Sequence, residues 1–260
     1  MKLLFKIGGT LLDGAASRAA IARQLAAIAR NHQLVVVHGG GKQVTRFLEE
    51  RGIASQFING LRVSDESVVD AVTQVVAGSV NKKLVSTLIA EGVSAIGLSG
   101  VDGQLTEVEP LNPDLRLVGK PGKSEGRLLE LLITAGYLPV IACIAGDSSG
   151  TIYNVNADQM AVSIALGWSA EGIVFLTDVP GVKGADGEVI PHLSESEAAE
   201  LIRSGVAQGG MRAKLEAATS ALRGGIPEVV IAPGHEPDVW ARIAAGDSLG
   251  SRILAGALHG

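Results

Sequence analysis

The sequence has little cysteine, few aromatic residues and no long apolar run. Its 260 residues include one cysteine, Cys143, and 3% aromatic residues. A single thiol excludes a disulfide framework and a thiolate metal cluster, and it is typical of a reducing cytoplasm. No apolar run reaches the ~18 residues of a membrane span, and residues 1–6 are too few for a signal peptide. We therefore expect a cytoplasmic protein without a membrane partner.

An excess of positive charge is also absent. The 22 lysines and arginines against 27 aspartates and glutamates give a formal net charge of −5. Proteins that bind nucleic acid need clustered Lys and Arg for the phosphate backbone, so we exclude a nucleic-acid partner. Glycine is plentiful instead, at 34 of the 260 residues. An excess over the usual share of roughly 7% is typical of proteins with many tight loops around a ligand.

Short β-branched runs alternate with amphipathic segments along the chain. The runs predict buried strands of a parallel sheet at 3–7, 34–37, 95–98, 138–142, 173–177 and 229–232. The amphipathic segments predict helices at 18–30, 43–51, 66–88, 128–135, 157–166, 195–204, 211–223 and 237–245. This alternation predicts an α/β fold with helices on both faces of a mostly parallel sheet. A segment rich in Pro, Gly and Lys at 112–125 predicts a hairpin, and a soft domain boundary falls near residue 168.

A strand that runs into a glycine turn occurs three times. The turns are Lys6-Ile7-Gly8-Gly9, His38-Gly39-Gly40-Gly41 and Thr177-Asp178-Val179-Pro180-Gly181. Glycine lets backbone N–H groups approach an anion, and a following helix adds its positive N-terminus. One glycine suffices for a tight turn, but three such turns at the C-terminal ends of strands favour a ligand site there.

Several charged residues stand in unusual positions. Each of them also has a structural explanation that requires no functional role. Lys6 lies in an apolar strand, where an anion would offset its desolvation, although it could also be a strand-end lysine that reaches solvent. Lys214 lies at the start of a helix, which disfavours a cation, but it could be a solvated lysine on the helix face. Asn156 is a natural N-cap with Asp158 in the first turn, which could explain both without a functional role. Arg62 could equally be a surface residue.

Two further motifs resemble other active sites. Gly122-Lys123-Ser124 resembles the end of a P-loop, but Leu117 stands where glycine is needed, so we reject this interpretation. Ser148 matches the nucleophile elbow of serine hydrolases, and residues 38–41 resemble their oxyanion loop. An elbow must lead from a strand into a helix, whereas residues 151–153 predict another strand. Ser148 is therefore better interpreted as a hairpin-turn residue.

Seven segments together resemble the acetylglutamate kinases of the amino-acid kinase superfamily, over essentially the whole chain. They are Lys6–Gly9, His38–Gly41, Asn59–Val63, Gly136–Val140, Asn154–Asp158, Thr177–Gly181 and the segment with Met211 and Lys214. The first and sixth are shared across the superfamily, and the third and fifth are more discriminating. A related carboxylate kinase, such as a carrier-linked aminoadipate kinase, is the alternative within the superfamily.

The resemblance implies a three-layer αβα fold with acceptor and dimer contacts in residues 1–167 and nucleotide contacts in residues 168–260. It implies MgATP-dependent phosphorylation of the side-chain carboxylate of N-acetyl-L-glutamate, the second step of arginine biosynthesis. A carboxylate is already ionised at pH 7, so no general base is needed. The metal would enter with the nucleotide, and no residue is expected to bind it directly. A serine hydrolase that uses Ser148 and a non-catalytic amino-acid sensor are the alternatives from other classes.

By motif position, the resemblance also assigns roles to residues. Lys6 and Lys214 would stabilise the transferring phosphoryl group, and Asp158 would orient both lysines. The acceptor would be held by Gly40, Gly41, Arg62 and Asn154. The nucleotide would be held by Gly8, Gly9, Asp178, Val179, Pro180, Gly181, Val182, Lys183, Val206, Ala207 and Gln208.

The resemblance also bears on assembly and regulation. Arginine-inhibited members carry an extra helix ahead of the first strand, and here residues 1–5 precede Lys6. We expect a homodimer that L-arginine does not inhibit. The segment 66–88 carries Val68, Val69, Val72 and Val76 along one side. This stripe is either the dimer contact or, equally, a face directed at the core.

Overall fold

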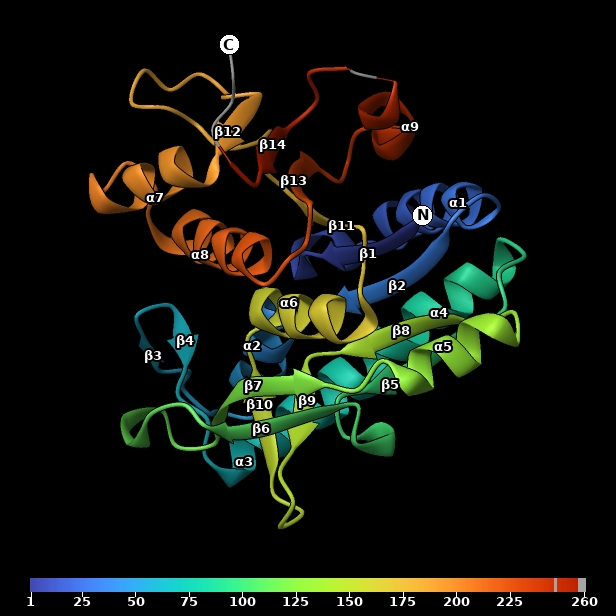
Figure 1. Ribbon diagram of the computed structural model, residues 1–260. Coiled ribbons are helices and arrows are strands. Elements are labelled where there is room, and N and C mark those ends of the chain that lie inside the picture. Colours follow the sequence, from blue (N-terminus) through green and yellow to red (C-terminus); the bar gives the residue numbers. More distant parts are fainter. Residues whose placement is uncertain (246, 257–260) are drawn as a thin grey trace.

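The computed structural model describes residues 1–245 and 247–256. Its central feature is an eight-stranded sheet (Figure 1). The strand order is β12 (His192–Ser194), β14 (Ser251–Leu254), β13 (Glu228–Pro233), β11 (Gly172–Thr177), β1 (Lys2–Ile7), β2 (Gln33–His38), β8 (Leu138–Ala142) and β5 (Ala95–Ser99). Neighbouring strands are parallel except β13 and β14, which are antiparallel. The prediction of a mostly parallel sheet is confirmed.

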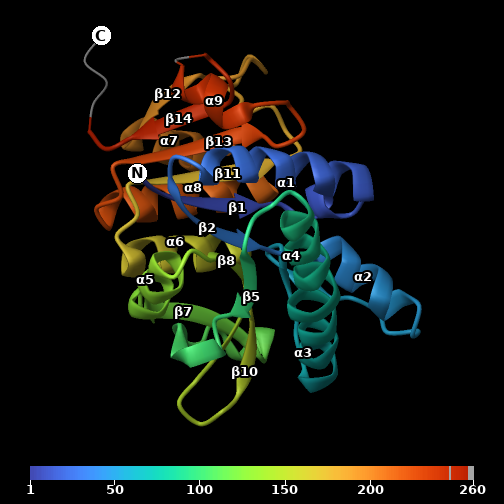
Figure 2. The same ribbon diagram turned by 90° about the vertical axis from the view of Figure 1, so that its right-hand side faces the viewer.

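Helices cover both faces of the sheet, as Figure 2 shows from the side. One layer contains α1 (Ala15–Ala29), α2 (Gly41–Glu49), α3 (Glu66–Val72), α4 (Asn81–Ala90) and α9 (Val239–Ala244). The other layer contains α5 (Arg127–Thr134), α6 (Ala157–Trp168), α7 (Glu195–Arg203) and α8 (Gly209–Arg223). The three-layer αβα fold is therefore confirmed. Short helical turns η1 (Gly9–Leu12), η3 (Asp102–Gln104) and η4 (Pro113–Leu115) join the larger elements.

The segment predicted as one helix at 66–88 is helical throughout but changes its winding. A π-helical stretch, η2 (Thr73–Val80), separates α3 from α4. Such stretches are rare and are frequently found at functional sites. Val68, Val69, Val72 and Val76 are all buried within the single chain. The stripe therefore faces the core, and its interpretation as the dimer contact is wrong for these side chains.

A second, smaller sheet lies beside the main one. Its strands are β6 (Thr106–Pro110), β7 (Val118–Ser124), β9 (Ile144–Gly146) and β10 (Ile152–Val155), and a separate hairpin joins β3 (Phe57–Ile58) to β4 (Leu61–Arg62). The segment 112–125, predicted to carry a hairpin, contains η4 and β7, and the antiparallel partner of β7 is β6, which precedes this segment. Ser148 lies in an exposed turn between the antiparallel strands β9 and β10. No helix follows it, so the nucleophile elbow is absent there.

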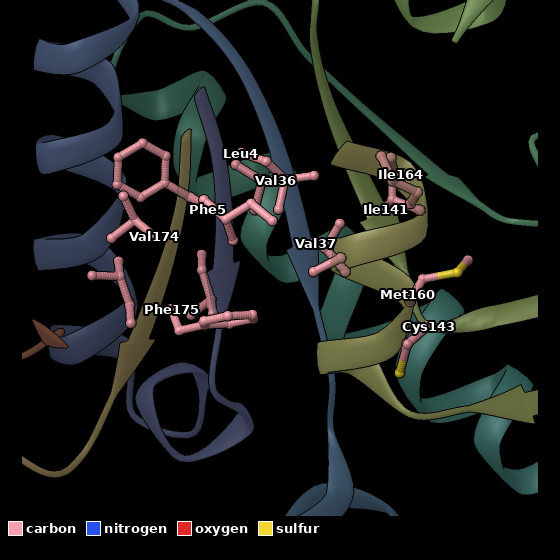
Figure 3. Packing of buried hydrophobic residues seen from close by; sticks show 14 of the residues in the cluster. Leu4, Phe5, Val36, Val37, Ile141, Cys143, Met160, Ile164, Val174 and Phe175 are labelled. Carbon is pink, nitrogen blue, oxygen red and sulfur yellow. The ribbon is translucent and has the colours of Figure 1, made fainter. Parts of the chain in front are cut away.

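The core fixes the position of α6 on the sheet. Met160 and Ile164 of α6 are fully buried and face Val37, Ile141 and Cys143 in the close view of Figure 3. Burial of apolar side chains of this size contributes ~1.5–3 kcal/mol each. The first turn of α6, which precedes these anchors, is thereby held against the C-terminal ends of the central strands.

The proposed boundary between residues 167 and 168 falls at the end of α6 and divides the sheet between β1 and β11. Residues 1–167 supply β1, β2, β8 and β5, and the following residues supply the other half. Gly246 and residues 257–260 of the second part lie outside the described residues. Within the described ranges, no helix combines the length and the apolar character that crossing a membrane requires.

Candidate active site

The site lies where the central parallel strands end. β1 runs into Gly8 and Gly9, β2 runs into the turn Gly39–Gly41, and β11 runs into Asp178. Parallel strands end at one edge of a sheet, so the three glycine turns predicted from the sequence come together there. α6 and α8 bring further charged side chains to the same edge.

Lys6, Asp158 and Lys214 form one buried charge cluster. The Nζ of Lys6 lies 2.7 Å from Oδ1 of Asp158, and the Nζ of Lys214 lies 3.5 Å from its Oδ2. The three residues come from β1, α6 and α8. Lys6 and Asp158 are only 7% and 5% exposed. The structure thus unites the three residues that the sequence predicts as catalytic, and it excludes a solvent-reaching Lys6.

The local backbone explains how Asp158 reaches this position. Asn156 caps α6, and its side chain accepts hydrogen bonds from the N–H groups of Asp158 and Gln159 at 2.9 and 3.1 Å. A carboxylate in the first turn is favoured by the helix dipole. The capping interpretation of this segment is therefore correct, and the Asp158 side chain makes the two lysine contacts in addition.

Within this three-residue cluster, two ammonium groups contact a single carboxylate. Burial alone would raise the pKa of Asp158, but Lys6 and Lys214 hold that pKa below its ordinary value. Burial lowers the pKa of Lys214, and the negative charges of Asp158 and Asp178 oppose this effect. Two ammonium groups thus share one carboxylate in a place with little water. Because an unbalanced buried charge is costly, the cluster favours an additional anion.

A cavity of about 170 Å³ lies next to this cluster, and its lining includes Asn156 and Ala157, which directly precede Asp158. Its walls include all four residues predicted to hold the acceptor, Gly40, Gly41, Arg62 and Asn154. The apolar part of the wall comes from Val72, Val76, Val118, Cys143 and Val155. Burial raises the pKa of the Cys143 thiol to about 11, so it stays protonated at neutral pH and acts as wall rather than nucleophile.

Arg62 is held firmly at this cavity and is 7% exposed. Its guanidinium donates hydrogen bonds to the Gly41 carbonyl at 3.1 Å, to Thr45 Oγ1 at 2.7 Å and to Ser55 Oγ. It also lies 4.7 Å from the centre of the Phe57 ring. Within residues 1–245 and 247–256, no carboxylate forms an ion pair with it. A rigid guanidinium without a counter-ion is suited to bind a carboxylate ligand.

Asn154 is positioned by a residue that sequence reasoning missed. Its Nδ2 donates to Ser64 Oγ at 3.0 Å, and the Ser64 hydroxyl donates to the Arg62 carbonyl at 2.9 Å. Ser64 is fully buried, and Asp65, the next residue, caps α3. The sequence predicts Ser64 as the N-cap of this helix, but the structure gives that role to Asp65, and the contact of Ser64 with Asn154 has no sequence signal.

The first two glycine turns approach each other closely. A Cβ added at Gly9 would lie 3.3 Å from Gly40 Cα, and a Cβ added at Gly40 would lie 3.1 Å from Val76 Cγ2. Gln43 Nε2 donates to the Gly9 carbonyl at 2.8 Å, which ties α2 to the first turn. The Gly8 N–H donates to Leu176 of β11 at 3.0 Å. Gly8 and Gly9 therefore lie between the cavity and the end of β11.

The remaining predicted nucleotide residues lie on two loops near Lys214. One loop follows β11 and contains Asp178, Val179, Pro180, Gly181, Val182 and Lys183; the other leads into α8 and contains Val206, Ala207 and Gln208. Val182 is buried and its N–H donates to Ser251 Oγ at 2.8 Å, so it supports the first loop. Val179 and Val206 are each 37% exposed and present apolar surface to solvent. Among the residues that the structure describes, no three His, Cys, Asp or Glu side chains gather as a metal site.

Comparisons with known proteins agree with this arrangement. Residues 1–233 match the amino acid kinase family. An acetylglutamate kinase from Solibacter usitatus is 52% identical over 98% of this chain and 99% of the relative. Another, from Acidobacterium capsulatum, is 42% identical over 92% of this chain and 93% of the relative.

Solved structures share the fold of this chain. An N-acetylglutamate synthase from Neisseria gonorrhoeae, complexed with coenzyme A and N-acetyl-glutamate, has a TM-score of 0.88 and 25% identity. The match covers 99% of this chain but 60% of the synthase chain. Giardia lamblia carbamate kinase bound to AMP-PNP matches 98% of both chains with a TM-score of 0.75, and at 15% identity it shows the fold alone. The chain therefore belongs to the amino acid kinase family and, within it, groups with the acetylglutamate kinases.

Proposed function

We propose that this enzyme transfers the γ-phosphoryl group of ATP to the side-chain carboxylate of N-acetyl-L-glutamate, giving N-acetyl-L-glutamyl 5-phosphate and ADP. This is the second step of arginine biosynthesis. The observation that carries the proposal is the buried Lys6–Asp158–Lys214 cluster next to a cavity lined by Arg62, which forms no ion pair with a carboxylate of the described residues. The names of the two bacterial relatives and the N-acetyl-glutamate in the Neisseria structure support the choice of acceptor.

Arg62 and Asn154 hold the acceptor in this proposal. The guanidinium binds the carboxylate that does not react, because its fixed N–H groups match the two oxygens of a carboxylate. The Asn154 amide, oriented by Ser64, contacts a polar group of the acceptor. The apolar wall at Val72 and Val76 excludes water from the remaining part of the bound acceptor.

Lys6 and Lys214 act on the phosphoryl group during transfer. The reacting carboxylate oxygen forms a bond to the γ-phosphorus, while the bond from that phosphorus to the oxygen of the β-phosphate breaks and ADP leaves. Negative charge spreads over the oxygens of the transferring group, and preorganised cations stabilise it. Asp158 holds both ammonium groups in place. The carboxylate is already ionised, so no side chain has to remove a proton.

The nucleotide lies along the second half of the sheet in this proposal. The turn at Gly8 and Gly9 and the loop 178–183 approach the phosphates, and residues 206–208 contact the nucleotide before α8 begins. Mg²⁺ enters with ATP and neutralises phosphate charge when bound. Apart from the turn at Gly8 and Gly9, this arrangement assigns the acceptor and the dimer contacts to residues 1–167 and the nucleotide to residues 168–260. We further propose that the enzyme works in the cytoplasm as a homodimer.

A coupled assay of ADP release tests the proposal. The panel contains N-acetyl-L-glutamate, free L-glutamate, N-acetyl-L-aspartate and an N-acylated 2-aminoadipate. We expect the highest kcat/KM with N-acetyl-L-glutamate and a kcat lowered by about 10²–10³-fold in Lys214→Ala. Lys123→Ala is the matched control, because that lysine is exposed and pairs with Glu125 on the surface. Preference for the aminoadipate derivative would favour the related carboxylate kinase, and no ADP release with any acid would reject the proposal.

A further inference from the structure

His38 and Asn81 form a buried polar pair that the proposed reaction does not use directly. His38 ends β2, immediately before the turn Gly39–Gly41, and Asn81 begins α4 directly after the π-helical stretch. Their exposed fractions are 0% and 1%. Asn81 Nδ2 lies 3.0 Å from His38 Nε2, and His38 Nδ1 lies 3.0 Å from the Gly39 carbonyl oxygen. Buried polar groups of this kind need complete hydrogen bonding to be tolerated.

The surroundings of Asn81 determine which imidazole nitrogen carries the proton. Its Nδ2 also donates to the Val140 carbonyl at 2.9 Å, and its Oδ1 accepts from Lys82 Nζ at 3.1 Å. The amide nitrogen therefore faces His38 and can only donate, so Nε2 of His38 accepts. Nδ1 then carries the proton and donates to the Gly39 carbonyl. Burial lowers the pKa of His38 to about 4, so the neutral ring persists at pH 7.

The hydrogen bond from His38 Nδ1 to the Gly39 carbonyl fixes the peptide group between Gly39 and Gly40. The carbonyl and the N–H of a trans peptide point in opposite directions. With the Gly39 oxygen held by His38, the Gly40 N–H points away from the imidazole. Gly40 lines the cavity and is buried, and in the described ranges its N–H donates to no protein acceptor. A buried, unpaired N–H is expensive unless a ligand accepts from it.

We infer that His38, held by Asn81, is a positioning residue that aims the Gly40 N–H at the negative charge of the transferring group. This inference rests on the proposed function and adds a specific donor to it. Asn81 sets the ring tautomer, the ring sets the peptide plane, and the peptide presents its N–H without reorganisation. The π-helical winding of η2 allows Val76 to support Gly40 while Asn81 reaches His38.

Kinetics of His38 variants test this role. His38→Leu removes the donor to Gly39, whereas His38→Asn places an amide N–H near the position of Nδ1. We expect His38→Leu to lower kcat by about 10²-fold, the scale for losing one aligned donor, with the KM for ATP changing by a few-fold at most. His38→Asn should keep at least tenfold more kcat than His38→Leu. Val36→Ala in the same strand is the control for lost packing, with near wild-type kcat. Equal kcat losses in all three variants would overturn the inference.

Nuclear magnetic resonance of protein with ¹⁵N-labelled histidine provides a readout that does not depend on activity. In the wild type at pH 7 we expect one imidazole with its proton on Nδ1, and this signal should be missing in His38→Asn. A His38 ring that carries its proton on Nε2, or that is charged at pH 7, would refute the inference. If the wild type phosphorylates no acid, the proposed function fails, while these spectra still decide the state of the pair.

Discussion

Asp158→Asn is the substitution whose effect follows most directly from the structure. It keeps the shape of the side chain and removes the charge that Lys6 and Lys214 share at 2.7 and 3.5 Å. At an effective dielectric constant of ~20, these contacts correspond to about 6 and 5 kcal/mol of attraction. Deprotonation of a lysine and relaxation of the surrounding structure recover part of this lost attraction. Removing one partner of a buried ion pair therefore costs ~3–5 kcal/mol. For a chain of this length, that loss lowers the Tm by roughly 6–20 °C.

Differential scanning calorimetry and urea denaturation at pH 7 measure this loss. Asp114→Asn is the matched control, because Asp114 is exposed and should change the free energy of unfolding by less than ~0.5 kcal/mol. Turnover of Asp158→Asn should fall as well, since both lysines lose their orientation. An Asp158→Asn protein within ~1 kcal/mol of the wild type would refute the reasoning, because the cluster would then not depend on its carboxylate.

Three further predictions concern the same site. Lys6→Ala or Lys214→Ala should lower kcat by about 10²–10³-fold with a smaller change in acceptor KM, and steady-state kinetics with near wild-type kcat would make that lysine structural. Arg62→Lys should raise acceptor KM strongly while the KM for ATP stays within a few-fold, because lysine cannot bind a carboxylate through two parallel N–H groups; equal damage to both would indicate a folding role. The pKa of His38 is about 4 in the folded chain against 6.5 for the free side chain. The unfolded state therefore binds the proton more readily, and stability is lost as the pH falls from 6.5 towards 4, by about 3 kcal/mol. Urea denaturation across this range should show a smaller loss in His38→Asn, and an identical pH dependence would contradict the assignment.

The central strands were predictable because parallel strands are buried on both faces. β8 has the predicted bounds, and β1 differs from the predicted 3–7 by one residue. The predicted helix at 195–204 is α7, which begins with a capping box of Ser194 and Glu197. What periodicity did not reveal is the π-helical winding at 73–80, since its apolar pattern resembles that of an ordinary helix.

The site was predictable only in part, because its residues acquire their roles through distant contacts. Glycine turns after strands indicated the correct edge of the sheet, and Lys6 was visible as a charge in an apolar strand. The resemblance assigned the orienting role of Asp158, whereas its local pattern did not reveal that role, since an N-terminal carboxylate on a helix needs no further explanation. Ser64 and Asn81 were missed because each acts on a residue far away in sequence, Asn154 and His38. Such pairs depend on tertiary packing, which no local pattern encodes.

Trapping of the product by hydroxylamine tests the central claim most directly. The enzyme is incubated with MgATP, N-acetyl-L-glutamate and hydroxylamine, and ADP and hydroxamate are quantified together by mass spectrometry. An acyl phosphate reacts with hydroxylamine, so we expect the side-chain hydroxamate of N-acetyl-L-glutamate in equimolar amount to ADP. With Lys214→Ala, both products should form about 10²–10³-fold more slowly. ADP released without any hydroxamate would contradict phosphorylation of the carboxylate.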